Sequence, residues 1–140
     1  MTRSPQDLGK RQDLMAKLAR LDITEDVRFD GRRMGEIVDE LGESTAESVI
    51  CAALEQLANG LSATRNAAVA GDRAGTVAQA EAVARLAWQL GLVSLAGVAV
   101  DVRRCADHRD QSALSATLAR LMRVGRRSLT EIWDGADMAG

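Results

Sequence analysis

Hydrophobic residues recur at helical spacing along most of the chain, and the longest such pattern occupies residues 72–104. This stretch contains no proline, and its apolar positions step by three and four residues, which places them on one stripe of an α-helix. The stripe consists of Val77, Ala80, Ala84, Ala87, Gly91, Leu95, Val98 and Val102. Val83, Leu86 and Leu90 widen it on one flank. The pattern predicts one long central helix that other helices cover over more than half of its circumference.

One strip of this predicted helix stays outside the apolar stripe. Glu81, Arg85 and Trp88 lie on it at i, i+4 and i+7, and Leu92 follows one turn later. Binding chemistry is therefore expected on this strip. The candidate partner-binding residues are Ala78, Glu81, Ala84, Arg85, Trp88 and Leu92.

Shorter apolar patterns predict four further helices, over residues 4–21, 31–41, 44–70 and 110–133. Ser4 and Pro5 suit the start of the first, and the sequence from Ser44 to Glu47 has the form of a capping box for the third. Gly71 and Asp72 combine a helix-ending glycine with an N-cap, so the third helix and the central helix should fold back antiparallel.

The predicted fold class is all-α, because no segment alternates with the period of two that a half-buried β-strand shows. Brief connections between long helices favour up-down neighbours. We therefore expect a four-helix up-down bundle over residues 28–134, preceded by an N-terminal helix and connector over 1–27. Residues 135–140 carry no apolar pattern and are expected to be disordered.

The charge balance restricts the classes of partner. The 140 residues include 18 Lys and Arg against 20 Asp and Glu, for a net charge of −2, which gives no electrostatic case for nucleic acid or an anionic membrane. The arginines of residues 103–127 are interpreted as a solvated helix surface. No apolar run approaches a membrane span, and the first residues lack the apolar core of a signal peptide, so a cytoplasmic protein is expected.

Candidate catalytic groups are few. Cys51 and Cys105 form no Cys-x-x-Cys pair and are interpreted as reduced, partly buried thiols. His108, the only histidine, falls in a predicted turn and is interpreted as a solvated residue. No phosphate-binding loop, zinc motif or calcium loop occurs. The residues thus predict no enzyme, no metal and no cofactor.

From Phe29 to about Leu129 the chain resembles a histidine-containing phosphotransfer (HPt) domain of bacterial phosphorelays. That family has the signature A-H-x-L-K-G-x-A-x-x-L-G, preceded some nine residues earlier by an Asp at a helix start. The corresponding positions here are Asp72, Ala80, Val83, Leu90-Gly91 and Leu95-Ala96. The resemblance implies a four-helix bundle that meets receiver domains.

The departures from this signature bear on function. Glu81 occupies the position of the phospho-accepting histidine, Ala84 that of the lysine, and Arg85 that of the glycine. The resemblance therefore implies a non-catalytic module that binds a response-regulator receiver domain or a histidine kinase around Glu81. Two alternatives stay open: a helical adaptor or homodimerising bundle outside phosphorelays, and a phosphotransfer protein with another acceptor such as His108. Monomer and homodimer are both compatible with the sequence.

Overall fold

The computed structural model describes residues 31–139, and every regular element in that range is an α-helix. The expected N-terminal helix over 4–21 and the boundary at residue 27 lie outside the described residues. The helices are α2 (Gly31–Leu41), α3 (Glu43–Val69), α4 (Arg73–Gln89), α5 (Val93–Asp107) and α6 (Gln111–Ala139). The predicted all-α fold class is confirmed.

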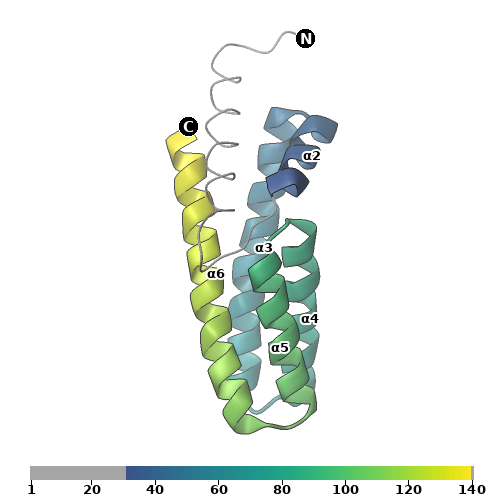
Figure 1. Cartoon of the computed structure of the whole chain (residues 1–140), viewed down its shortest axis with the longest axis vertical. Coiled ribbons are helices and arrows are strands. Elements are labelled where there is room, and N and C mark those ends of the chain that lie inside the picture. The colour runs from purple at the N-terminus through teal and green to yellow at the C-terminus, as the bar shows by residue number, and fades with distance from the viewer. Residues whose placement is uncertain (1–30, 140) are drawn as a thin grey trace.

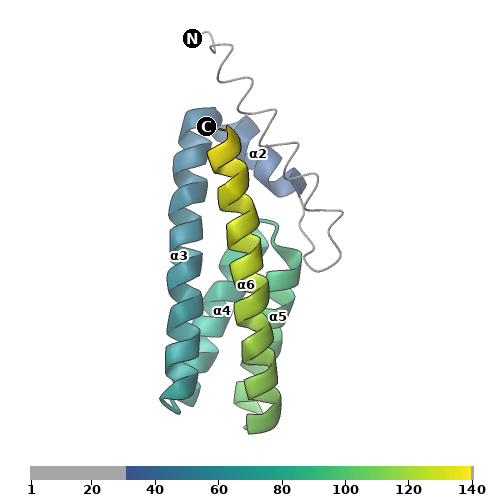
Figure 2. The same ribbon diagram turned by 90° about the vertical axis from the view of Figure 1, so that its left-hand side faces the viewer.

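Helices α3 to α6 run side by side in alternating directions, and α2 packs beside α3 at one end (Figures 1 and 2). Helices α4 and α5 are shorter than α3 and α6 and therefore cover only part of their length (Figure 2). The bundle proper is thus α3–α6, with α2 as a short addition. This arrangement leaves the outer surfaces of α4 and α5 next to each other on one face of the molecule (Figure 1).

The prediction of one central helix over 72–104 is wrong, because the chain reverses direction at Leu90–Leu92. Gly91 has a φ of 79°, a left-handed conformation that glycine adopts without steric cost. The Leu92 amide donates to the Ala87 carbonyl at 2.8 Å, and the Gly91 amide donates to the Trp88 carbonyl at 3.1 Å. This pair of bonds is the Schellman motif, which satisfies the last carbonyls of α4. One predicted helix is therefore an antiparallel pair, α4 and α5.

Similar reversals end α3 and α5. Gly71 follows α3 with a φ of 73°, and the Asp72 side chain then accepts a hydrogen bond from the Gly75 amide, as an N-cap does. The predicted helical hairpin at Gly71 and Asp72 is confirmed. After α5 the left-handed position is occupied by Arg109, with a φ of 56°, and Asp110 caps α6 by accepting from the Ala113 amide at 3.1 Å.

Two other boundaries differ from the sequence prediction. Helix α3 begins at Glu43 behind Gly42, which has a φ of 83°, and no side chain caps it. The capping box proposed for Ser44 to Glu47 does not form, because both residues already lie within the helix. Helix α6 continues through Ala139, beyond the predicted end at residue 133, so it includes nearly all of the segment 135–140 that was expected to be disordered.

Apart from Leu92, which was assigned to the polar strip, the core follows the predicted apolar stripes. Its most completely buried side chains come from every described helix: Met34, Leu54, Leu57, Val83, Leu92, Leu95, Val102 and Leu121. Buried hydroxyls bond within their own helices; the Thr64 hydroxyl, for example, donates to the Gly60 carbonyl at 2.7 Å. Gly60 lets α3 approach α4 closely, since a Cβ there would lie 2.9 Å from a methyl carbon of Val83. Close packing of α3 and α4 thus fixes the orientation of the outer surface of α4.

Candidate docking face

Helix α4 holds most of the predicted partner-binding strip on the outside of the bundle. Arg85 and Trp88 are exposed, and Trp88 keeps 68% of its surface accessible. Ala78 is also exposed, whereas Glu81 and Ala84 are partly buried where α4 meets α5. The core stripe Thr76, Ala80, Val83 and Ala87 points the other way and is buried. The amphipathic spacing of α4 therefore orients the strip as predicted, and we call this surface, with the adjoining outside of α5, the α4–α5 face.

Leu92 does not belong to this face. Its side chain is 1% exposed and forms part of the core, so its assignment as a partner-binding residue is wrong. The assignment assumed that α4 continued past residue 90, where helical spacing would bring Leu92 under Trp88. The reversal at Gly91 resets the helical phase and turns Leu92, now the first residue before α5, towards the interior.

Ion pairs link α4 to α5 across this face. The Glu81 carboxylate lies 3.5 Å from the Arg103 guanidinium, which is also 4.0 Å from the Asp107 carboxylate. Arg73 in turn lies 4.0 Å from Asp107. All four side chains are between 34% and 48% exposed, so solvent screens the pairs and each contributes at most about 1 kcal/mol. Their main effect is to position the Glu81 carboxylate beside a cation.

Two shallow hollows flank Trp88 and Glu81. One, of about 300 Å³, is lined by Glu81, Ala84, Arg85, Val100 and Arg103. The other, of about 340 Å³, is lined by Arg33, Trp88, Gln89, Gly91 and Val93. The face thus combines an exposed aromatic ring, arginines and small apolar side chains.

Three contributors to the face were not found from the sequence: Val100 and Arg103 of α5, and Arg33 of α2. The first two reach the face only because α5 folds back along α4. Arg33 arrives from a distant part of the chain, and its Nε donates to the Gln89 carbonyl at 3.0 Å, near the C-terminus of α4. A guanidinium at a helix C-terminus is electrostatically favourable. No local sequence pattern signals such a contact.

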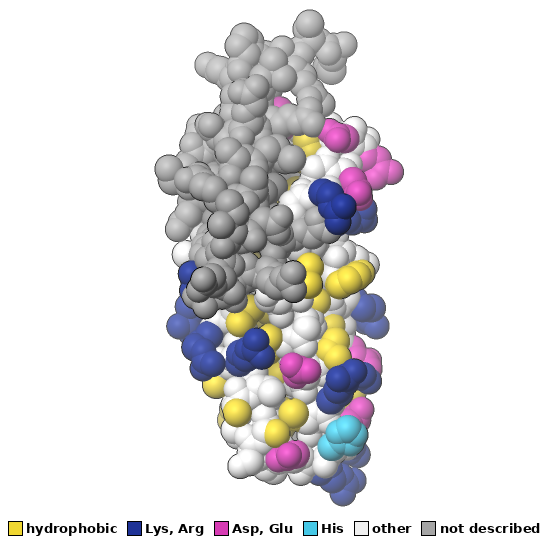
Figure 3. Space-filling view, in the orientation of Figure 1, with side chains coloured by type: hydrophobic (Ala, Val, Ile, Leu, Met, Phe, Trp, Pro, Cys, Tyr) yellow, Lys and Arg dark blue, Asp and Glu magenta, His cyan; other side chains and the backbone are white. Residues whose placement is uncertain are grey.

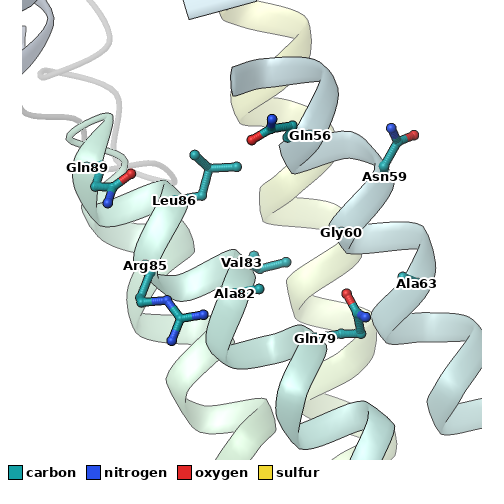
Figure 4. Close-up of a pocket in the computed structure, with 10 residues that line it drawn as sticks. All are labelled: Gln56, Asn59, Gly60, Ala63, Gln79, Ala82, Val83, Arg85, Leu86 and Gln89. Atoms are coloured by element: carbon teal, nitrogen blue, oxygen red, sulfur yellow. The ribbon is translucent and has the colours of Figure 1, made fainter. Parts of the chain in front are cut away.

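A separate groove of about 440 Å³ runs between α3 and α4 (Figure 4). Its floor is formed by small and aliphatic residues, including Gly60, Ala63 and Val83, and amide side chains stand along its sides. Arg85 lines this groove as well as the hollow beside Glu81. The groove contains no cluster of ionisable groups that would support catalysis.

The structure also places the other chemical candidates named from the sequence. His108 is exposed at the end of α5, as predicted for a solvated turn residue. Burial raises the pKa of the Cys51 thiol, and the carboxylates of Glu47 and Glu55 raise it further, so the thiol is not activated as a nucleophile. Among the side chains that the structure describes, no group of three His, Cys, Asp or Glu residues could hold a metal ion.

None of the described helices combines the length and the apolar character that crossing a lipid bilayer requires. Comparison of the chain with protein-family models, with curated proteins and with solved structures gives no match. A functional assignment therefore depends on the residues of the α4–α5 face themselves.

Proposed function

We propose that this protein is a non-catalytic helical signalling module, similar to an HPt domain, that binds a receiver domain or a histidine kinase through the α4–α5 face. The observation that carries the proposal is the exposure of Trp88 beside Arg85. Tryptophan and arginine are the residue types most enriched at interface hot spots. The accessible 68% of the indole is apolar surface that a partner can bury.

The composition of the face supports binding to a folded protein surface. Ala84, Val93 and Val100 are partly buried, small and apolar, so a partner can approach the backbone of both helices closely. Arg85 makes no ion pair with any other residue of the described range and is thus available to a partner carboxylate. An apolar centre with arginines at its edge is the usual composition of a protein-binding patch.

The geometry around Glu81 supports a role without phosphoryl transfer. The Glu81 carboxylate is already paired with Arg103, and no lysine or histidine stands within the set of residues that line its hollow. Arg85 places a long side chain where the HPt signature has a glycine, which obstructs in-line approach of a phosphorylated aspartate. Binding requires neither an acceptor histidine nor a lysine, so the face can bind a partner without transferring a phosphoryl group.

The direct test compares Trp88→Ala with Val69→Ala, a matched control, because Val69 is 81% exposed at the far end of α3. Calorimetry against a panel of isolated receiver domains and histidine-kinase dimerisation domains gives the readout. We expect Trp88→Ala to weaken binding by ~2 kcal/mol or more, roughly thirtyfold in Kd, and Val69→Ala to leave it unchanged. Absence of binding by the unmodified protein, or equal effects of both substitutions, would refute the proposal.

A second experiment tests the register of the resemblance. The variant with Glu81→His, Ala84→Lys and Arg85→Gly restores the three departures from the HPt signature on a partly exposed surface. We expect it to accept phosphate from a phosphorylated receiver, whereas the single variant Glu81→His should accept much less. The opposite outcome is a triple variant that folds but takes up no phosphate from any receiver that binds the protein. It would show that residue 81 is not the position of the acceptor.

A further inference from the structure

The groove between α3 and α4 collects most of the amide side chains of residues 31–139. That range contains six Asn and Gln residues, and four of them, here called the groove amides, line the groove: Gln56 and Asn59 of α3, and Gln79 and Gln89 of α4. Figure 4 shows Gln56 extending from α3 towards α4, and Gln79 from α4 towards α3. This concentration gives the groove a chemistry that differs from the rest of the surface.

The groove amides have unused hydrogen-bonding capacity. Their side chains form no hydrogen bond with any residue that the structure describes, and the contact between Arg33 and Gln89 uses the Gln89 backbone carbonyl. Each primary amide offers two N–H donors and one carbonyl acceptor, the same kinds of group as a peptide unit. The floor of Gly60, Ala63 and Val83 provides no polar side chain to pair with them. The groove can therefore pair with a ligand that both donates and accepts hydrogen bonds.

Charge is nearly absent from the groove. On the face shown in Figure 3, charged side chains of both signs stand among apolar ones over α4, α5 and α6. Among the residues that line the groove, Arg85 alone carries a charge, and it forms no ion pair with a described residue. A guanidinium binds a carboxylate strongly, often through two parallel hydrogen bonds. A ligand of the groove should therefore be largely uncharged, with one carboxylate near Arg85.

These features favour an extended polypeptide over other ligands. An extended segment leaves its backbone N–H and C=O groups unpaired, and primary amides match both. A helix satisfies these groups internally and would leave the groove amides unused. Gln79 and Gln89 are ten positions apart, which is about 15 Å along α4 at about 1.5 Å per residue. An extended chain rises about 3.3 Å per residue, so the groove accommodates about four or five residues.

We propose that the groove between α3 and α4 binds a short extended peptide segment of a partner protein. The groove amides hold the backbone of the segment, and an Asp or Glu side chain of the segment pairs with Arg85. Because the floor residues are small or buried, the segment can lie close to both helices. The groove shares only Arg85 and Gln89 with the hollows of the α4–α5 face, so this inference goes beyond the proposed function and does not depend on it.

Selection of phage-displayed random hexapeptides on the full chain supplies the probe. We expect enriched sequences with an Asp or Glu at one fixed position and without apolar residues at helical spacing. N-methylation of single backbone amides of a selected peptide should raise its Kd at least roughly tenfold at two or more positions, because it removes a hydrogen-bond donor. Fluorescence polarisation measures these values. Absence of enriched peptides, helical spacing within them, or Kd values that are insensitive to N-methylation would overturn the proposal.

Paired amide substitutions locate the bound peptide. Gln56→Met with Gln79→Met should raise the peptide Kd at least roughly tenfold, because side chains of similar length then lack the donors and acceptors. The matched control is Asn66→Leu with Gln111→Leu, which alters the two exposed amides outside the groove and should leave the Kd unchanged. Circular dichroism checks that both double variants are helical. Equal effects of the two pairs would contradict binding in the groove.

Arg85→Gln tests the carboxylate contact. It should raise the Kd of the selected peptide at least roughly tenfold, but it should leave unchanged the Kd of a peptide in which the acidic residue is replaced by its amide. If the variant weakens both peptides equally, the acidic residue does not pair with Arg85 and that part of the proposal is wrong.

Blocking the groove separates this site from other occupants and from the α4–α5 face. Ala82→Leu fills the groove from an exposed position and should abolish peptide binding, whereas Ala116→Leu, at an exposed position of α6, should not. Trp88→Ala should leave the peptide Kd unchanged, because Trp88 does not line the groove. A loss as large as that caused by Ala82→Leu would place the peptide on the α4–α5 face and overturn the inference. Self-association of the chain that Ala82→Leu abolishes would assign the groove to a second copy instead.

Discussion

Replacement of Gly91 by alanine changes the stability of the protein in opposite directions for two arrangements of residues 72–104. One is the antiparallel pair α4 and α5, and the other is a single continuous helix. Gly91 has a φ of 79°, and an alanine held in that left-handed region costs about 1–2 kcal/mol. Alanine also lowers the entropy of the unfolded chain, which offsets about 0.4–1 kcal/mol of that cost. We therefore expect Gly91→Ala to destabilise the protein by about 1 kcal/mol. In a continuous helix the same change would stabilise it by about 1 kcal/mol.

Urea denaturation followed by far-UV circular dichroism measures this difference, with Gly97→Ala as the control. Gly97 lies inside α5, is exposed, and a Cβ at that position would have no atom within 4 Å. Its replacement should therefore stabilise the protein by about 1 kcal/mol, as expected for a helix interior. The denaturation midpoints of the two variants should move in opposite directions. A Gly91→Ala variant as stable as Gly97→Ala would refute the reversal at residues 90–92.

Three further substitutions test the packing and the turns, each by the same denaturation assay. Leu57→Ala should lose about 2–5 kcal/mol, because Leu57 is 0% exposed in the core; a loss below 1 kcal/mol would contradict that burial. Gly125→Ala should destabilise by about 1–3 kcal/mol rather than stabilise α6, because its Cβ would lie 2.6 Å from a Leu61 methyl carbon. Arg109→Gly should stabilise by up to about 1 kcal/mol, since it relieves a left-handed φ of 56° at a non-glycine residue; a destabilised variant would exclude that conformation.

Apolar periodicity predicted the fold class and most of the core, because the three-and-four spacing within each helix reports directly which side is buried. Asp72 was recognisable as an N-cap from a local signal as well, because it directly follows the helix-ending Gly71. Gly91 was not recognised, since a glycine in an apolar helical pattern is compatible with both a helix interior and a helix end. Only the packing of α5 against α4 distinguishes the two.

The candidate site was predictable to the extent that it lies on α4 alone. The exposure of Trp88 and Arg85 follows from their spacing relative to Ala80 and Ala87, and it is confirmed. The error at Leu92 follows directly from the missed reversal. Contributions from Arg103 and Arg33 depend on how α5 and α2 are placed, which a single sequence without an identified turn does not determine.

The order of the helices in space has a consequence for the rate of folding. Each of α3, α4 and α5 packs against the next helix in the chain, and the pairing of α3 with α6 closes the bundle. Most tertiary contacts therefore join segments that are close in sequence, which gives a low contact order and folding within microseconds to milliseconds. The α3–α6 contact encloses the longest loop and loses the most chain entropy, so it should form last. A helical hairpin such as α4–α5 is then the natural nucleus, and its turn at Gly91 would govern how fast the bundle assembles.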